Sequence, residues 1–250
     1  MIAIRRTVIF LFCFSLCAFA QTAEELVAKN IQARGGLEKM KAINTLRFTA
    51  NLDQGGFKAV IGQESKRPSF YRTTVTIQGM TRIQAYDGGT AWQISPFSGK
   101  KDPQLMSEDE SRGMVEEADF DGPLVDAQAK GNKIEYLGMD QVDGDDAYKL
   151  KVTLKNGDIL YYYLDPDTYL EIQVDRQQFI RGSVRESVTV LGAYKPVHGV
   201  MYPFSIEAGS KNNPNARARI TVQKMEANVP VNDADFKFPA PPAAQHTPAK

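Results

Sequence analysis

The sequence predicts a mainly β protein with a few helices, built around one large antiparallel sheet. Apolar and polar residues alternate with period two in about eleven or twelve segments between residues 44 and 227. Tight-turn signals separate these segments, among them Gln54-Gly55-Gly56, Asp87-Gly88-Gly89 and Asn156-Gly157. Many short strands joined by tight turns favour a sheet that curls into a sandwich or a barrel.

Residues 1–20 have the features of an export signal. Arg5 and Arg6 precede a short apolar run, and Ala18-Phe19-Ala20 fits a cleavage site. Cleavage after Ala20 would remove both cysteines, so we expect a mature chain without thiols or disulfides. The remaining chain carries 28 basic and 30 acidic residues, a net charge of −2, which does not favour a nucleic-acid partner. Export without an anchor predicts the periplasm or the medium.

Two stretches have helical rather than strand character. Thr22 to Met40 reads as a helix that Gly35-Gly36 breaks or kinks, with Leu26, Val27, Ile31 and Arg34 along one side. A second helical stretch, at about residues 106–130, interrupts the strands and is acidic at its start. We expect a single domain over residues 21–239, followed by a flexible tail, residues 240–250, rich in Pro and Ala.

The common catalytic and metal-binding patterns are missing from the sequence. His198 lies in a turn and is expected to be exposed, and no G-x-S-x-G, H-E-x-x-H or calcium-loop motif occurs. The aspartates between residues 140 and 146 fit a hairpin turn better than a cation site. The acidic run Glu108 to Glu117 fits a solvated helix better than a pair of catalytic carboxylates. We therefore expect no enzyme activity, no metal and no cofactor.

Aromatic residues are abundant after residue 20, with ten Tyr, nine Phe and a single Trp. A curved sheet of about eleven strands is wider than its own side chains can fill, so helices or a ligand must occupy the hollow. The aromatic residues near the middle of the N-terminal strands are either ordinary core or the lining of an apolar cavity. The pattern by itself leaves both interpretations open.

A group of motifs narrows this choice. Lys66-Arg67-Pro68-Ser69-Phe70 is followed by Asp87-Gly88-Gly89-Thr90-Ala91-Trp92 and then by Pro96-Phe97. Their order and spacing, together with the ending Asp233 to Pro239, resemble the outer-membrane lipoprotein carrier family, LolA. The resemblance covers most of residues 21–239. The length of the chain, Gly35-Gly36 and the hairpins of residues 143–163 look more like the broader group of lipoprotein-sorting proteins, which shares its fold with lipid-binding lipoproteins and with a sensor domain of periplasmic stress regulators.

The resemblance implies an unclosed antiparallel barrel of about eleven strands whose hollow is covered by a helical lid. It implies that Arg67 acts as a latch, by donating hydrogen bonds to backbone carbonyls of the lid. The residues expected to line the cavity are Phe48, Phe70, Tyr86, Trp92, Phe97 and Tyr162.

The implied function is that of a monomeric periplasmic carrier, or chaperone, for the acyl chains of lipoproteins or lipids. Such a carrier would receive its cargo from an inner-membrane donor complex and pass it to an outer-membrane acceptor. Two alternatives remain open. One is a module that senses lipids or lipoproteins with the same fold, and the other is an unrecognised hydrolase that uses the acidic run.

Overall fold

The computed structural model describes residues 21–180 and 182–239. The expected export signal, residues 1–20, and the expected tail, residues 240–250, lie outside this part of the chain. Among the described residues, no helix combines the length and the apolar character needed to cross a bilayer.

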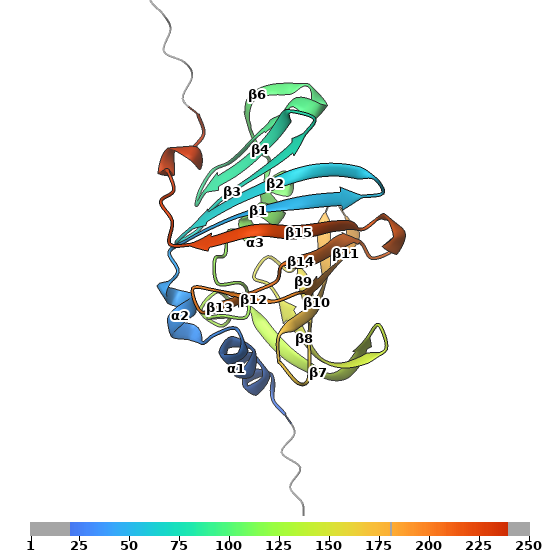
Figure 1. The fold of residues 1–250 in the computed structure, drawn as a ribbon. Coiled ribbons are helices and arrows are strands. Elements are labelled where there is room, and N and C mark those ends of the chain that lie inside the picture. The colour runs from blue at the N-terminus through green and yellow to red at the C-terminus, as the bar shows by residue number, and fades with distance from the viewer. Residues whose placement is uncertain (1–20, 181, 240–250) are drawn as a thin grey trace, which may run out of the picture.

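One antiparallel sheet of thirteen strands dominates the structure (Figure 1). Its order is β6-β5-β4-β3-β2-β1-β15-β14-β11-β10-β9-β8-β7, so the edge strands β6 and β7 do not pair and the sheet stays unclosed. The strands are β1 Thr45–Gln54, β2 Phe57–Lys66, β3 Phe70–Ile77, β4 Met80–Asp87, β5 Ala91–Ser95, β6 Lys100–Leu105, β7 Lys133–Val142, β8 Asp145–Thr153, β9 Ile159–Leu164, β10 Glu171–Ile180, β11 Ser183–Gly192, β14 Ser205–Ser210 and β15 Ala218–Ala227.

The predicted fold class is confirmed, and the sheet is slightly larger than expected. A separate two-stranded ribbon pairs β12 Lys195–Val197 with β13 Val200–Tyr202. These strands are three residues long, and β6 contains Pro103, so none of the three carries a clear period-two signal. Strand β15 returns from the C-terminal half to pair with β1, and this pairing joins the two halves of the sheet.

The helices are short and lie over the concave face. The predicted N-terminal helix is divided into α1 Ala23–Ala33 and α2 Leu37–Ala42, with Gly35 and Gly36 at the break. Helix α3, Glu108–Glu117, packs Met114 against Tyr71 of β3 and lies behind β1 and β15 in Figure 1. Residues 124–130 form turns instead of a second helix. Three single-turn helices, η1 Pro96–Ser98, η2 Pro214–Ala216 and η3 Asp233–Asp235, complete the described elements.

The concave face is filled at one end of the sheet. Leu26 of α1 packs against Leu150 and Leu164, which project from β8 and β9. Leu124, from the turns after α3, continues this core over neighbouring residues of the same strands. Burying each such side chain contributes roughly 1.5–3 kcal/mol, so this end is closed by core packing.

The C-terminal segment covers part of the convex face. Phe236 is completely buried and meets the ring of Phe70 edge-on, with 5.5 Å between the ring centroids. The indole Nε1 of Trp92 donates to the carbonyl oxygen of Phe236 at 2.8 Å. Lys66 pairs with Asp233 just upstream. These contacts fasten residues 228–239, which we call the strap, across the outside of β1 to β5.

Phe236→Ala should remove the main apolar anchor of the strap. We expect the free energy of unfolding to fall by about 3–5 kcal/mol, because a fully buried ring leaves a cavity. Chemical denaturation measures this loss, and emission from the only tryptophan should shift to longer wavelength as water reaches Trp92. Phe57→Ala, at an exposed hairpin end, is the control and should change stability by no more than about 0.5 kcal/mol.

Candidate functional site

Arg67 lies at the point where β2 turns into β3 and binds two separate segments. Its Nε donates to the carbonyl oxygen of Ile43 at 2.7 Å, and its Nη2 donates to that of Met40 at 2.9 Å. Both carbonyls belong to the end of α2, and that of Met40 also accepts from the backbone nitrogen of Ile43 at 3.3 Å. Nη1 and Nη2 also form a forked pair with the carboxylate of Asp121. The guanidinium therefore makes four hydrogen bonds. Such a planar, forked arrangement of donors favours arginine over lysine at this position.

Asp121 is the second member of this contact. Its side chain is 8% exposed and also accepts a hydrogen bond from Lys41 Nζ at 2.6 Å. Burial alone would raise the pKa of Asp121, but the hydrogen bonds from Arg67 and Lys41 outweigh burial and lower the pKa to about 2. The carboxylate therefore stays charged at neutral pH. Helix α2 is thus held to residues 119–132, which we call the cover, through Asp121 and through a second contact from Lys41 Nζ to Asp126 at 2.7 Å.

A glycine break places Arg34 beside the same region. Gly35 has φ +120°, and an added Cβ would lie 2.2 Å from the carbonyl oxygen of Gly199. Only glycine permits this close approach, which lets the backbone nitrogen of Met201 donate to the carbonyl oxygen of Arg34 at 2.8 Å. The end of α1 is thereby joined to β13, and the side chain of Arg34 reaches the interior.

A cavity of about 710 Å³ lies on the concave face beneath α3 and the cover. Its volume falls within the roughly 300–1,000 Å³ of small-molecule sites. Pro68 and Ser69, the two residues after Arg67, belong to its wall. The apolar and aromatic lining is Pro68, Tyr86, Val115, Pro123, Leu154, Leu160, Tyr162, Val174, Leu191, Tyr194, Met201 and Pro203.

Charged residues also line this cavity, which the expectation of an apolar hollow did not include. Arg34 lies 3.7 Å from the carboxylate of Glu171, and the hydroxyl of Tyr194 donates to the carbonyl oxygen of Glu171 at 2.8 Å. Arg176 of β10 lies 3.2 Å from Glu116 of α3. Burial raises the pKa of Glu116, and the nearby positive charge of Arg176 opposes this shift. The wall is therefore amphipathic.

The six predicted lining residues divide between the two faces of the sheet. Tyr86 and Tyr162 line the cavity. Phe48 is half-buried and pairs with Gln63, whose amide oxygen accepts from the hydroxyl of Tyr71, so it lies on the concave face. The remaining three lie elsewhere: Phe70 and Trp92 under the strap, and Phe97 exposed on η1.

Sequence reasoning missed Arg34, Asp121 and Arg176. One signal was available, because Arg34 falls on the apolar side of the predicted helix, where a charged residue needs a buried partner. Arg176 shows the same feature in weaker form, on a strand between Val174 and Gln178. Asp121 meets a residue 54 positions away, and no local pattern predicts that contact.

The residues considered for catalysis lie mostly where the sequence indicated. His198 is exposed in its turn. Asp140 pairs with Lys149 at 2.7 Å, and Asp143 has the positive φ of a turn residue. Among the described residues, no cluster of three His, Cys, Asp or Glu could hold a metal. Glu116 differs from the expected solvated residue, since it turns inward to the cavity.

Comparisons with known proteins agree on the fold. No protein-family model and no curated protein match the sequence. A DUF1329 family protein from Desulfovibrio piger matches with a TM-score of 0.60 at 13% identity, over 87% of this chain and 98% of that one. A LolA superfamily protein from Nitrosomonas europaea matches with a TM-score of 0.59 at 13% identity, over 87% and 98%.

A third structure, an outer membrane lipoprotein-sorting protein domain from Vibrio parahaemolyticus, matches with a TM-score of 0.55 at 12% identity. The match covers 84% of this chain and 97% of that domain. At such identities the likeness shows the fold alone. The resemblance suggested by the motifs is thus confirmed at that level, and the chain has the LolA-like fold.

Proposed function

We propose that this protein is a non-enzymatic carrier that holds the acyl chains of lipoproteins or lipids in the concave cavity. The observation that supports this best is the position of the hollow, which lies inside an unclosed sheet and beneath the cover, held by Arg67, by Lys41 and by packing against α2. A sheet with unpaired edges can widen without breaking strand pairs. The aliphatic side chains of Leu160, Val174 and Leu191 on β9 to β11 offer acyl chains a surface on which to bury.

Arg67 acts as the latch of the empty carrier. It bonds α2 and Asp121 at once, so the cover cannot move away until these hydrogen bonds break. A hydrogen bond to a charged group contributes about 1.5–3 kcal/mol, so the four bonds together resist opening by several kcal/mol. Each methylene buried on binding contributes about 0.8 kcal/mol, so an alkyl chain of ordinary length offsets the cost of breaking the latch. The net free energy of binding then stays small enough for release.

The carrier works outside the cytoplasm, in the periplasm, after cleavage of residues 1–20 behind Ala20. It acts as a monomer without cofactor or metal, takes its cargo from an inner-membrane donor and yields it to an outer-membrane acceptor. The cleavage motif and the motifs around Arg67 and Trp92 support this assignment. A lipid-sensing module would bind the same cargo and keep it, so release separates the two functions.

Delipidated protein should bind a dodecyl-chain alcohol, dodecanol, with one ligand per chain. Isothermal titration calorimetry measures the stoichiometry, and heat capacity should fall on binding because apolar surface is buried. The protein is also incubated with acyl esters. Esters that are recovered intact support a carrier, whereas cleaved esters would point to the hydrolase alternative. A protein that takes up none of these alkyl ligands is not a carrier of acyl chains.

Arg67→Leu should leave the fold intact and slow the release of bound dodecanol by at least tenfold. Loss of one charged hydrogen bond already changes an equilibrium constant by about a factor of ten. The variant no longer gains the latch hydrogen bonds when it releases its ligand and closes, so release is less favourable. Stopped-flow displacement by excess lipid vesicles measures the rate. Arg47→Leu is the matched control, since Arg47 also bonds a carboxylate and a backbone carbonyl but lies on the convex face. Unchanged release in the Arg67 variant would disprove the latch.

Acid should weaken the latch through Asp121. Its folded-state pKa, about 2, lies below the ordinary 3.8, so its charged form stabilises the fold above pH 4 and this contribution disappears as pH falls from about 4 to 2. The shift corresponds to roughly 2 kcal/mol. Unfolding free energies measured across this range should therefore fall more steeply for the native chain than for Asp121→Asn. Asp235→Asn, at an exposed position, should keep the native slope.

A further inference from the structure

Two arginines in the cavity wall donate no hydrogen bond to any described residue. In the described part of the chain, Arg34 has one ion pair, to Glu171 at 3.7 Å, and its guanidinium donates no hydrogen bond. Arg176 lies 3.2 Å from Glu116 and 3.7 Å from Glu117, again without a hydrogen bond. The facing Oε2 of Glu116 is itself buried and without a hydrogen-bond partner. Each guanidinium offers five N–H donors, so most of this capacity is unused.

Several arginines outside the cavity use their donors. Arg67 makes four hydrogen bonds and Arg47 makes two. Arg72 and Arg217, in contrast, each have only an ion pair at 3.8 Å. Arg34 and Arg176 are the two arginines that line the cavity, where a ligand can reach their donors. Polar groups away from bulk water are costly unless they are bonded, so donors left open here favour an occupant rich in oxygen acceptors.

The two arginines converge on one part of the wall. Burial raises the pKa of Tyr162, and the charges that act on this phenol include both Arg34 and Arg176. Tyr194 adds a second hydroxyl beside Glu171. The carboxylates of Glu171, Glu116 and Glu117 balance the charges of the two arginines only loosely, because none of them accepts a hydrogen bond from either arginine. In contrast, Lys130 and Asp119 in the same wall form a tight pair at 2.6 Å.

We propose that the cavity binds an amphiphile whose head is a phosphate or a carboxylate, with Arg34 and Arg176 donating to the head group. The alkyl part lies along Leu160, Val174 and Leu191. The inference rests on the proposed function, since it needs alkyl chains to enter this cavity, and it narrows the cargo to a free anionic lipid. A guanidinium fork matches either oxyanion, and a phosphate supplies one more acceptor than a carboxylate.

Four ligands with one shared alkyl chain test this assignment: dodecanol, dodecanoate, dodecyl phosphate and dodecyltrimethylammonium. Calorimetry on the delipidated full mature chain should give Kd values about tenfold lower for the two anions than for the alcohol, since charged hydrogen bonds are added. Dodecyltrimethylammonium should bind no better than the alcohol. Tighter binding of the phosphate identifies phospholipid-type heads, and tighter binding of the carboxylate identifies fatty acids.

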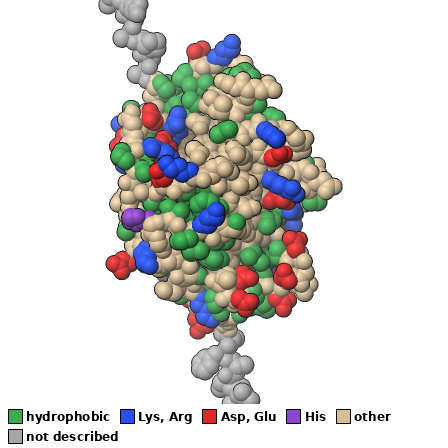
Figure 2. Space-filling view, in the orientation of Figure 1, with side chains coloured by type: hydrophobic (Ala, Val, Ile, Leu, Met, Phe, Trp, Pro, Cys, Tyr) green, Lys and Arg blue, Asp and Glu red, His purple; other side chains and the backbone are tan. Residues whose placement is uncertain are grey.

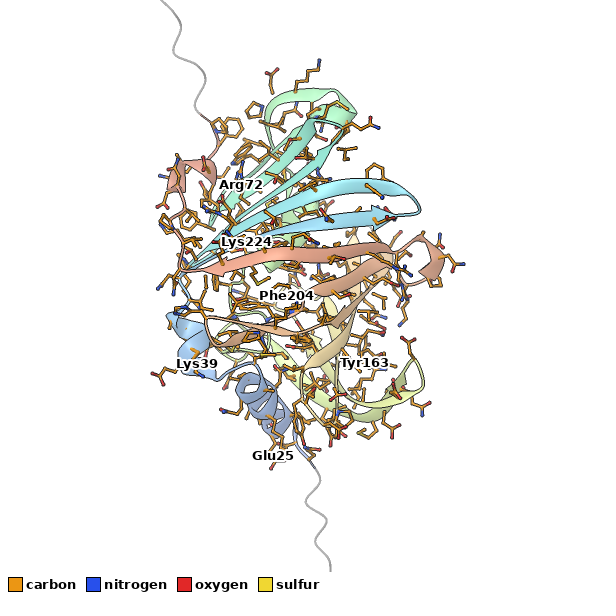
Figure 3. The ribbon with its side chains drawn as sticks, viewed as in Figure 1. Glu25, Lys39, Arg72, Tyr163, Phe204 and Lys224 are labelled. Carbon is orange, nitrogen blue, oxygen red and sulfur yellow. The ribbon has the colours of Figure 1, made fainter. Side chains whose placement is uncertain are left out.

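Arg176→Gln should lower the preference for anions, measured in the variant itself as the Kd of dodecanol divided by that of the anion, from about tenfold toward one. Arg176→Lys keeps the positive charge but lacks the forked N–H donors, so it should retain part of the preference for anions. This variant replaces Arg176→Gln in the test if the glutamine variant is unstable. Arg72→Gln is the control, because Arg72 projects from the convex face of β3, next in sequence to the inward-facing Tyr71 (Figure 3). It should behave like the native protein.

The outcomes separate this inference from the proposed function. If the alcohol and both anions bind equally, the cavity holds alkyl chains but not an anionic head, and the inference is wrong. If the anions are preferred and Arg176→Gln keeps that preference, the head group lies elsewhere and the inference is also wrong. If no alkyl ligand binds at all, the proposed carrier function itself fails.

Discussion

The contact between Arg67 and Asp121 is the point on which the covered side of the molecule depends. It joins the turn between β2 and β3, the end of α2 and the turns after α3, three segments that share no strand pairing. Lys41 strengthens the same carboxylate from within α2. A buried carboxylate with several charged partners is strongly oriented, and loss of any one partner leaves the others incompletely satisfied. The concave face is therefore closed by a polar contact rather than by apolar packing alone.

The size of the sheet explains why such a contact is needed. Thirteen strands curve around more space than one short helix can occupy. At the end near β7 to β9, Leu26 and Leu124 fill the hollow and make an ordinary core. Farther along the concave face, α3 and the cover span the space without filling it, and the cavity of about 710 Å³ remains. The filled core and the cavity thus occupy different parts of the concave face, and the cavity wall carries Arg34 and Arg176, which form no hydrogen bond with described residues.

The convex face is stabilised by different means. The strap packs Phe236 between β3 and β5 and leaves Trp92 just 3% exposed. Elsewhere on this side basic and acidic side chains are intermixed, as Figure 2 shows, with neither sign gathered into a large field. Tyr163 and Lys224, labelled in Figure 3, come from β9 and β15. The strap and the cover are thus held by separate sets of contacts on opposite faces of the sheet.

The amino-acid sequence determined the strands, the hairpin turns and the interruption by helices, because side-chain alternation and turn chemistry are local. It also pointed to Arg67, through the order and spacing of motifs that resemble those of the LolA family. Only the tertiary structure decided which aromatic residues face the hollow. The register of β4 and β5 pairs Tyr86 with Ala91, which puts Tyr86 and Trp92 on opposite faces of the sheet. The partners of Arg34 and Arg176 lie on segments far apart in the chain, so no local pattern encodes these contacts.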